Sequence, residues 1–298
     1  MMNVIPPSLK KGDTVGFIAP SSPLMLGRIE SGIHYFESKG FKVKLGKHLE
    51  NAERFLAGND EDRANDIMSF FIDPDVKAII ATAGGHGSQR LLPLLDYDVI
   101  RANPKIITGF SDTTALQLGL FKKTGLVSYT GFTLRDTDPG KPDPLVDRTF
   151  ISCLMGETYC VTEGTLVHSG IAEGCLIGGT LSLISTLMGT PYQPDFRGKI
   201  LFFEQVGTEP SQVDGMLLQL SQADIFDEIA GVIIGQFEYC VSHDPDRDGT
   251  IDDVINEWSS RFRVPCLKDF PYGHGDRRCV LPIGKNVKLD VDAIRVTV

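Results

Sequence analysis

The turn around Ser111 has the clearest potential for chemistry in this sequence. The apolar run 105–110 leads into Ser111, and a helical pattern starts at once with Asp112 or Thr113. A serine on a strand-to-helix turn presents its hydroxyl at the carboxyl end of a sheet, where the helix N-terminus favours negative charge. This placement suits a nucleophile that attacks a carbonyl. The alternative is that Ser111 only caps the following helix, since serine is a preferred N-cap residue.

A serine nucleophile requires a base, and the base requires an acid that orients it. His274 lies between two glycines in a loop that follows an apolar run, and loops on rigid scaffolds often carry function. Glu204 comes directly after the apolar strand 199–203, where a carboxylate must be solvated or paired. Glu209 and Asp214 are nearby acids that the sequence leaves as competitors for the same role.

A glycine-rich turn, Gly84-Gly85-His86-Gly87, stands between a predicted strand and a predicted helix. Glycines let the backbone approach a ligand closely, and exposed N–H groups there could stabilise an oxyanion. The turn does not have the dinucleotide-binding spacing, and the chain contains no Walker sequence. We therefore expect no nucleotide cofactor.

The acidic loop Asp244–Asp252 resembles the opening of a calcium-binding EF-hand loop. Ile255 occupies the position at which such a loop needs its bidentate acid, and Pro245 stiffens the turn. The mismatch favours an acidic turn before a helix over 251–262, although the sequence leaves calcium binding open.

Composition places the chain among globular proteins and excludes several kinds of partner. Of its 298 residues, 42% are hydrophobic and 23% are charged, and 29 Lys and Arg against 39 Asp and Glu give a net charge of −10. Without a basic cluster, nucleic acid and anionic membranes are not expected partners. No apolar run is long enough to span a bilayer, no leader pattern is visible, and the six cysteines have no C-x-x-C spacing. We expect a cytoplasmic protein with reduced thiols and no metal.

Two kinds of element must position the candidate residues. Over the first 130 residues, apolar strands alternate with amphipathic helices, which predicts an α/β domain with a parallel sheet. The expected strands are 14–18, 41–45, 76–82 and 105–110. The Pro-rich stretch 136–144 follows, and strand signals then dominate at 170–177, 199–203, 231–237, 287–291 and 294–298. We therefore predict an α/β domain over 1–140, a linker over 141–165 and a mixed α+β domain over 166–298.

Several short motifs occur in order along nearly the whole chain: Leu9–Val15, Ala19–Pro23, Phe55–Gly58, Gly84–Gly87, Gly109–Asp112, Gly189–Tyr192, Lys199–Glu204, Gly273–Gly275 and Leu281–Gly284. By these motifs the chain resembles the LD-carboxypeptidase family of serine peptidases, which includes muramoyl-tetrapeptide carboxypeptidases and microcin C self-immunity hydrolases. The resemblance implies a flavodoxin-like N-terminal domain that carries the nucleophile and a C-terminal domain that carries acid and base, with the active site in the cleft between them.

The resemblance also implies a role for each candidate residue. Ser111 would be the nucleophile, His274 the general base and Glu204 its orienting partner. The N–H groups of Asp112 and Gly85 would form the oxyanion hole. No metal or cofactor is implied, and family members are commonly homodimers.

The implied reaction is hydrolysis of the L,D amide bond that releases terminal D-alanine from murein tetrapeptide in cell-wall recycling. The alternative within enzymes is cleavage of an aminoacyl-nucleotide conjugate, as in the self-immunity branch. A third reading is a non-catalytic binding protein on the same fold. The sequence does not choose between a diaminopimelate and a lysine stem.

Four positions depart from the family's usual residues. Ala83 stands where the family often has arginine, His86 where it has an aromatic residue, Thr180 where it has asparagine, and Gly215 where it has arginine. Arginine is the preferred bidentate donor to a carboxylate, so its loss at two positions bears on substrate choice.

Overall fold

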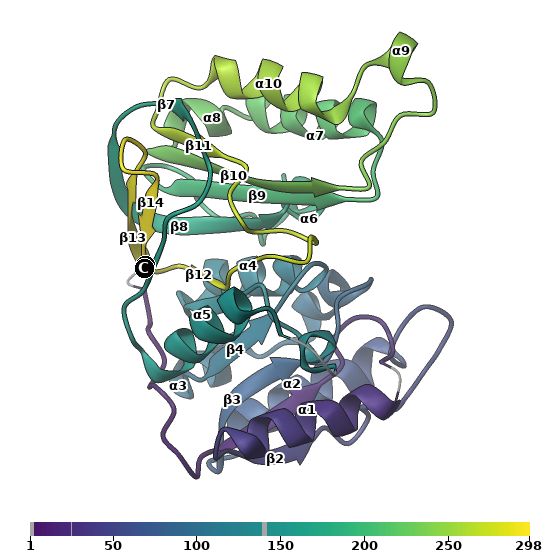
Figure 1. Ribbon diagram of the computed structural model, residues 1–298. Helices are drawn as coiled ribbons and strands as arrows, with labels where there is room; N and C mark the ends of the chain where they lie inside the picture. The colour runs from purple at the N-terminus through teal and green to yellow at the C-terminus, as the bar shows by residue number, and fades with distance from the viewer. Residues whose placement is uncertain (1–2, 25, 139–141) are drawn as a thin grey trace. The chain divides into compact units, whose positions relative to one another are not determined.

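A computed structural model describes residues 3–24, 26–138 and 142–298 (Figure 1). The chain divides into two compact units, one formed by Met1–Glu157 with Val280–Gly284 and the other by Thr158–Cys279 with Lys285–Val298. Each unit is built on one β-sheet. The α/β class agrees with the predicted fold, and in the first unit one antiparallel strand is added to the predicted parallel sheet.

The first unit contains five parallel strands in the order β5-β4-β3-β1-β2. This order is the flavodoxin-like one, in which functional residues gather at the carboxyl ends of the strands. A sixth strand, β12, pairs antiparallel with β5 at the sheet edge. The strands are β1 (Thr14–Ile18), β2 (Lys42–Leu45), β3 (Val76–Ala81), β4 (Ile106–Gly109), β5 (Ser128–Thr130) and β12 (Leu281–Ile283).

Helices of the first unit begin and end where local signals predict. The side chain of Asn59 accepts a hydrogen bond from the backbone of Asp62 and so caps α2, and α4 ends at Gly125, whose φ of 75° is the left-handed conformation that glycine favours. The helical elements are α1 (Leu26–Ser38), α2 (Asp60–Ile72), η1 (Ser88–Leu94), α3 (Tyr97–Ala102), α4 (Thr113–Thr124), η2 (Leu134–Thr137) and α5 (Pro144–Met155).

The α5 helix lies inside the stretch 141–165, which the sequence predicts as a linker. Its Phe150 is fully buried and stacks on Phe132, with ring centroids 3.6 Å apart. Asp143 caps the helix and Pro144 occupies its first turn. Proline is common at the first position of a helix, so the prolines that indicate a loop here also mark the start of α5. The boundary between the units therefore lies after α5, and the strand β12 returns late in the chain to the first unit.

The second unit contains one mixed sheet in the order β6-β14-β13-β8-β9-β10-β11-β7. Strands β8 to β11 are parallel, and the strands on either side of them are antiparallel to their neighbours. The strands are β6 (Cys160–Val161), β7 (Thr165–His168), β8 (Ile171–Thr180), β9 (Ile200–Val206), β10 (Gly231–Glu238), β11 (Cys266–Lys268), β13 (Asn286–Asp290) and β14 (Arg295–Thr297).

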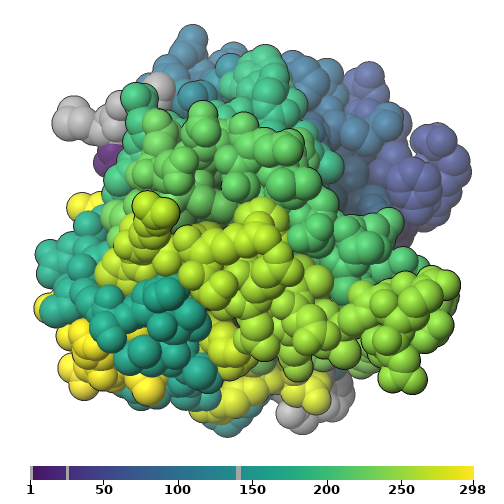
Figure 2. Space-filling view, turned by 90° about the horizontal axis from the view of Figure 1, so that it is seen from above, coloured from purple at the N-terminus to yellow at the C-terminus, as the bar shows by residue number. Residues whose placement is uncertain are grey.

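Helices α7, α8 and α10 lie along one side of this sheet (Figure 1), and Figure 2 looks down on the green and yellow-green surface of this part of the chain. Trp258 of α10 is buried and its indole N–H donates to Asp214 of α7 at 2.7 Å. The helices of the unit are α6 (Leu181–Leu187), α7 (Pro210–Gln222), α8 (Ile225–Glu228), α9 (Pro245–Asp248) and α10 (Ile251–Arg261).

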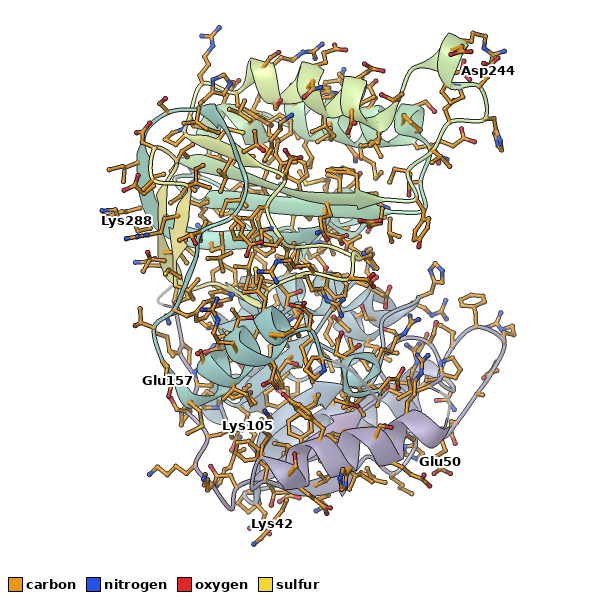
Figure 3. All side chains as sticks on the ribbon, viewed as in Figure 1. Lys42, Glu50, Lys105, Glu157, Asp244 and Lys288 are labelled. Carbon is orange, nitrogen blue, oxygen red and sulfur yellow. The ribbon has the colours of Figure 1, made fainter. Side chains whose placement is uncertain are left out.

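The acidic loop Asp244–Asp252 forms the short helix α9 and leads into α10. Figure 3 shows Asp244 on the projecting segment. Thr250 and Asp253 form a reciprocal capping box at the start of α10, which is the predicted acidic turn before a helix. Asp248 is paired with the neighbouring Arg247. Across the described ranges no helix has both the length and the apolar composition needed to cross a bilayer.

Candidate active site

Ser111 occupies the sharp turn between β4 and α4, as the sequence predicts. Its φ is 65°, in the left-handed region that non-glycine residues rarely adopt, and its carbonyl accepts the Thr114 N–H at 2.8 Å. The N-cap of α4 is Asp112. Asp112 itself has a helical backbone, and the left-handed backbone of Ser111 differs from the extended backbone typical of a capping serine. Strained backbone of this kind is found at the nucleophile of strand-turn-helix hydrolase sites.

The glycine-rich turn approaches Ser111 closely within the first unit. A Cβ atom on Gly84 would lie 2.8 Å from the Ser111 Cβ and 2.9 Å from the Phe110 carbonyl oxygen, so no larger residue fits there. Gly85 has a φ of 114°, and a Cβ there would lie 2.1 Å from the Ser22 hydroxyl oxygen. The backbone at Gly84 thus lies against the candidate nucleophile, and the N–H of the next residue, Gly85, is the candidate donor to an oxyanion.

His86 continues this turn and is exposed. Its backbone N–H donates to the Ser22 hydroxyl at 3.2 Å, and its ring meets Phe55 edge to face, with centroids 6.0 Å apart. Phe55 is itself 55% exposed. His86 thus makes a ring-to-ring contact from the position at which the family usually has an aromatic residue.

The carboxylate of Asp112 connects the Ser111 turn to the glycine-rich turn. It is 4% exposed and accepts hydrogen bonds from the Ser21 hydroxyl at 2.6 Å, the Ser88 N–H at 2.8 Å and the Gly87 N–H at 3.2 Å. The Ser88 hydroxyl donates in addition to the Asp112 carbonyl at 2.6 Å. The sequence interpretation considered only the N–H of Asp112. The sequence could have pointed to Ser21, since this residue belongs to the motif Ala19–Pro23.

The second unit brings Glu204 and His274 together. Glu204 lies on β9 and is fully buried, and its Oε2 is 2.7 Å from Nδ1 of His274, whose side chain is 21% exposed. The Thr180 hydroxyl donates to Oε1 of the same carboxylate at 2.5 Å. With Nδ1–H donated to the carboxylate, Nε2 is the ring nitrogen that can accept a proton. This tautomer is assigned from the hydrogen bonds.

The competing acids have other partners. Glu209 lies 3.1 Å from Nε2 of His243, and both side chains are well exposed. Asp214 accepts the indole N–H of Trp258. Of the three candidates, Glu204 is the one that contacts His274.

The loop around His274 is held by Gln236 of β10, a residue that the sequence interpretation missed. The Gln236 Oε1 accepts the Gly275 N–H at 3.2 Å, its Nε2 donates to the Arg277 carbonyl at 3.0 Å, and its backbone N–H donates to the Tyr272 carbonyl at 2.9 Å. A lone glutamine in a strand carries no sequence signal for this role.

The structure therefore provides two groups of candidate residues. Ser111, Asp112 and the turn 84–87 lie together in the first unit, and Glu204 and His274 lie together in the second. The first group supplies a serine on a strained turn beside backbone donors, and the second a histidine oriented by a buried carboxylate. These are the parts that serine hydrolases use.

Comparison with known proteins covers both units. Residues 15–131 match the model of the LD-carboxypeptidase N-terminal domain and residues 173–289 that of the C-terminal domain. The chain is 36% identical over 295 residues to a probable murein peptide carboxypeptidase of Bacillus subtilis, covering 97% of this chain and 92% of the relative.

Solved structures agree with these matches. The microcin C7 self-immunity protein in complex with aspartyl sulfamoyl adenosine superposes with a TM-score of 0.89 at 29% identity, covering 99% of this chain and 98% of that one. Muramoyltetrapeptide carboxypeptidase from Oxalobacter formigenes gives a TM-score of 0.87 at 28% identity, covering 95% and 97%. Together, these matches show that the chain belongs to the LD-carboxypeptidase family of serine-type carboxypeptidases.

Proposed function

We propose that the chain hydrolyses the L,D amide bond of murein tetrapeptide and releases the terminal D-alanine during cell-wall recycling. Family membership and the names of its relatives support an amide hydrolase of this kind. The observation that carries the proposal is the 2.7 Å contact between the buried carboxylate of Glu204 and His274. A buried carboxylate is costly unless it is paired, and here its partner is an imidazole suited to move a proton.

In the proposed mechanism Ser111 is the nucleophile. Nε2 of His274 accepts the hydroxyl proton while the serine oxygen attacks the carbonyl carbon of the scissile amide, and Glu204 stabilises the imidazolium that forms. Backbone N–H groups of Gly85 and Asp112 stabilise the oxyanion of the tetrahedral intermediate. His274 then protonates the departing amine of D-alanine, and a water molecule hydrolyses the acyl-enzyme by the reverse sequence of proton transfers.

A second candidate is hydrolysis of an aminoacyl-nucleotide conjugate. The similarity to the microcin C7 self-immunity protein supports it, and so does Ala83, which stands where an arginine for a peptide carboxylate is often found. The two activities share the triad and differ in what lies beside the scissile carbonyl. Substrate assays must separate them.

The direct test is to incubate the purified chain with murein tetrapeptide and, separately, with an aspartyl adenylate conjugate. We expect D-alanine from the first, measured by coupled D-amino acid oxidation, and little free aspartate from the second. Ser111→Ala should lower D-alanine release by several decades, whereas Ser69→Ala, at an exposed serine on α2, should leave it unchanged. Unaltered release by Ser111→Ala would refute the mechanism. Tight binding without product from either substrate would indicate a binding protein.

We also propose that the protein works in the cytoplasm, as a homodimer. Buried thiols at Cys240 and Cys266 suit a reducing compartment, and burial raises the pKa of Cys266 to about 12. Cell fractionation tests the location, and sedimentation equilibrium tests the dimer.

A further inference from the structure

Gly87, at the end of the glycine-rich turn, is held on both sides by buried charged groups. Its N–H donates to Oδ1 of Asp112 at 3.2 Å, and its carbonyl accepts from Nη1 of Arg63 at 3.1 Å. Asp112 and Arg63 are 4% and 2% exposed. Hydrogen bonds to buried charged groups are stronger than those between neutral ones, so this residue has little freedom to move.

Arg63 connects the same turn to the end of β1. Its Nη1 also donates to the Pro20 carbonyl at 2.5 Å, and its Nη2 contacts Asp60. Burial lowers the pKa of the Arg63 guanidinium, while the negative charges of Asp60 and Asp112 act to raise it. The guanidinium therefore lies in the field of Asp112.

The space around Gly87 is closed as well. Its φ is 109°, and a Cβ there would lie 2.4 Å from Leu56 Cδ2 and 3.1 Å from Arg63 Nη1. At the other end of the turn, the Gly84 carbonyl accepts the Ser22 N–H at 3.2 Å. The segment between them, which contains Gly85, is thus fixed at both ends.

We propose that Arg63 and Asp112 are positioning residues that clamp Gly87 and thereby hold the Gly85 backbone beside Ser111 as an oxyanion hole. This inference rests on the proposed function, since it assigns the clamp to the reaction of Ser111. The Asp112 side chain then has a role separate from its backbone N–H. It joins the turn that carries the nucleophile to the turn that carries the second donor.

The physical reason lies in the conformational freedom of glycine. A turn with three glycines in 84–87 samples many backbone conformations unless contacts restrict it. An oxyanion hole stabilises the transition state because its donors are already in place, and removing one donor costs about 10²–10³ in kcat. Loosening the turn without removing a donor should cost less, about 10- to 100-fold in kcat, with KM changed by less than about threefold.

The test compares Asp112→Asn with Asp66→Asn. Both aspartates are 4% exposed and lie in the first unit, but the carboxylate of Asp66 bonds to His48, at 2.9 Å from both its backbone N–H and its Nδ1, instead of to either turn. Asparagine at 112 replaces one acceptor oxygen by an NH₂ group that faces backbone donors. We expect faster hydrogen exchange in the peptide 82–91 and about 10- to 100-fold slower labelling of Ser111 by a fluorophosphonate, together with the loss of kcat. Asp66→Asn should change none of these beyond about twofold.

The clamp is refuted if Asp112→Asn and Asp66→Asn show the same hydrogen exchange in the peptide 82–91 and the same rate of Ser111 labelling. If Asp112→Asn does not fold, Ser88→Ala serves instead, because it removes the 2.6 Å hydrogen bond from the Ser88 hydroxyl to the Asp112 carbonyl, which joins the two turns. We then expect kcat to fall about three- to tenfold, on the order of the free energy of one neutral hydrogen bond. If the fluorophosphonate labels Ser111→Ala as it labels the wild-type protein, Ser111 is not the nucleophile. The exchange of peptide 82–91 would then still decide whether the clamp holds the turn.

Discussion

Replacing Glu204 by glutamine tests the proposed role of the acid without changing its size. The carboxylate is fully buried and accepts hydrogen bonds from His274 and from Thr180. Glutamine offers one acceptor oxygen and one NH₂ group. Because the Thr180 hydroxyl can accept as well as donate, the amide can turn its oxygen to His274 and its NH₂ group to Thr180. The fold and the ring orientation should then survive while the negative charge is lost.

The cost follows from the bond that changes. A hydrogen bond to a charged group contributes about 1.5–3 kcal/mol, and each 1.36 kcal/mol in the barrier is a factor of ten in rate. The imidazolium that forms during attack loses its charged partner, so we expect kcat to fall roughly 10- to 200-fold. This loss is smaller than that expected for Ser111→Ala or His274→Ala, because the base itself remains.

The assay is release of D-alanine under saturating substrate, with a thermal unfolding curve for each variant. Glu209→Gln is the matched control, since that carboxylate is exposed and pairs with the exposed His243, and it should change kcat by less than about twofold. A Glu204→Gln enzyme within threefold of wild type would refute the reasoning. So would a larger loss from Glu209→Gln, which would mean that Glu204 is not the acid.

Four further outcomes are expected. His274→Ala should lower kcat by several decades with little change in unfolding free energy; near-normal turnover would exclude it as the base. Gln236→Ala, which frees the loop around His274, should lower kcat about tenfold with KM nearly constant, and added loop exchange should accompany the loss. Phe150→Ala should cost about 3–5 kcal/mol in urea unfolding, where a linker residue would cost under about 1 kcal/mol. Burial and the carboxylate of Asp147 raise the pKa of Tyr35, so the phenol stays protonated in the folded state. The free energy of unfolding that this shift contributes is fully present below pH ~10, the pKa of an unfolded tyrosine, and is lost progressively as the pH rises above it. Tyr35→Phe should therefore flatten the decline of stability at alkaline pH.

Much of the fold could be predicted because its signals are local. The apolar runs predicted as strands at 14–18, 76–82 and 105–110 form β1 (14–18), β3 (76–81) and β4 (106–109) in the structure. The strand β12 could not be predicted in the same way. Its three residues lie late in the sequence, within the range predicted for the second domain. Only their pairing with Ser128–Thr130 shows that they belong to the first sheet.

The sequence by itself determined which residue types are available and in what order, and the motifs they form indicated the family. It determined that Ser111 lies on a strand-to-helix turn, because hydrophobic pattern and capping are short-range properties. Apart from the family resemblance, the residues left Glu204, Glu209 and Asp214 as competitors, and the tertiary structure shows that Glu204 is the one bonded to His274, across 70 positions of the chain. It also decided that the Asp112 carboxylate faces Gly87 and Ser88. Contacts between distant segments depend on how whole elements pack, and no local pattern encodes that packing.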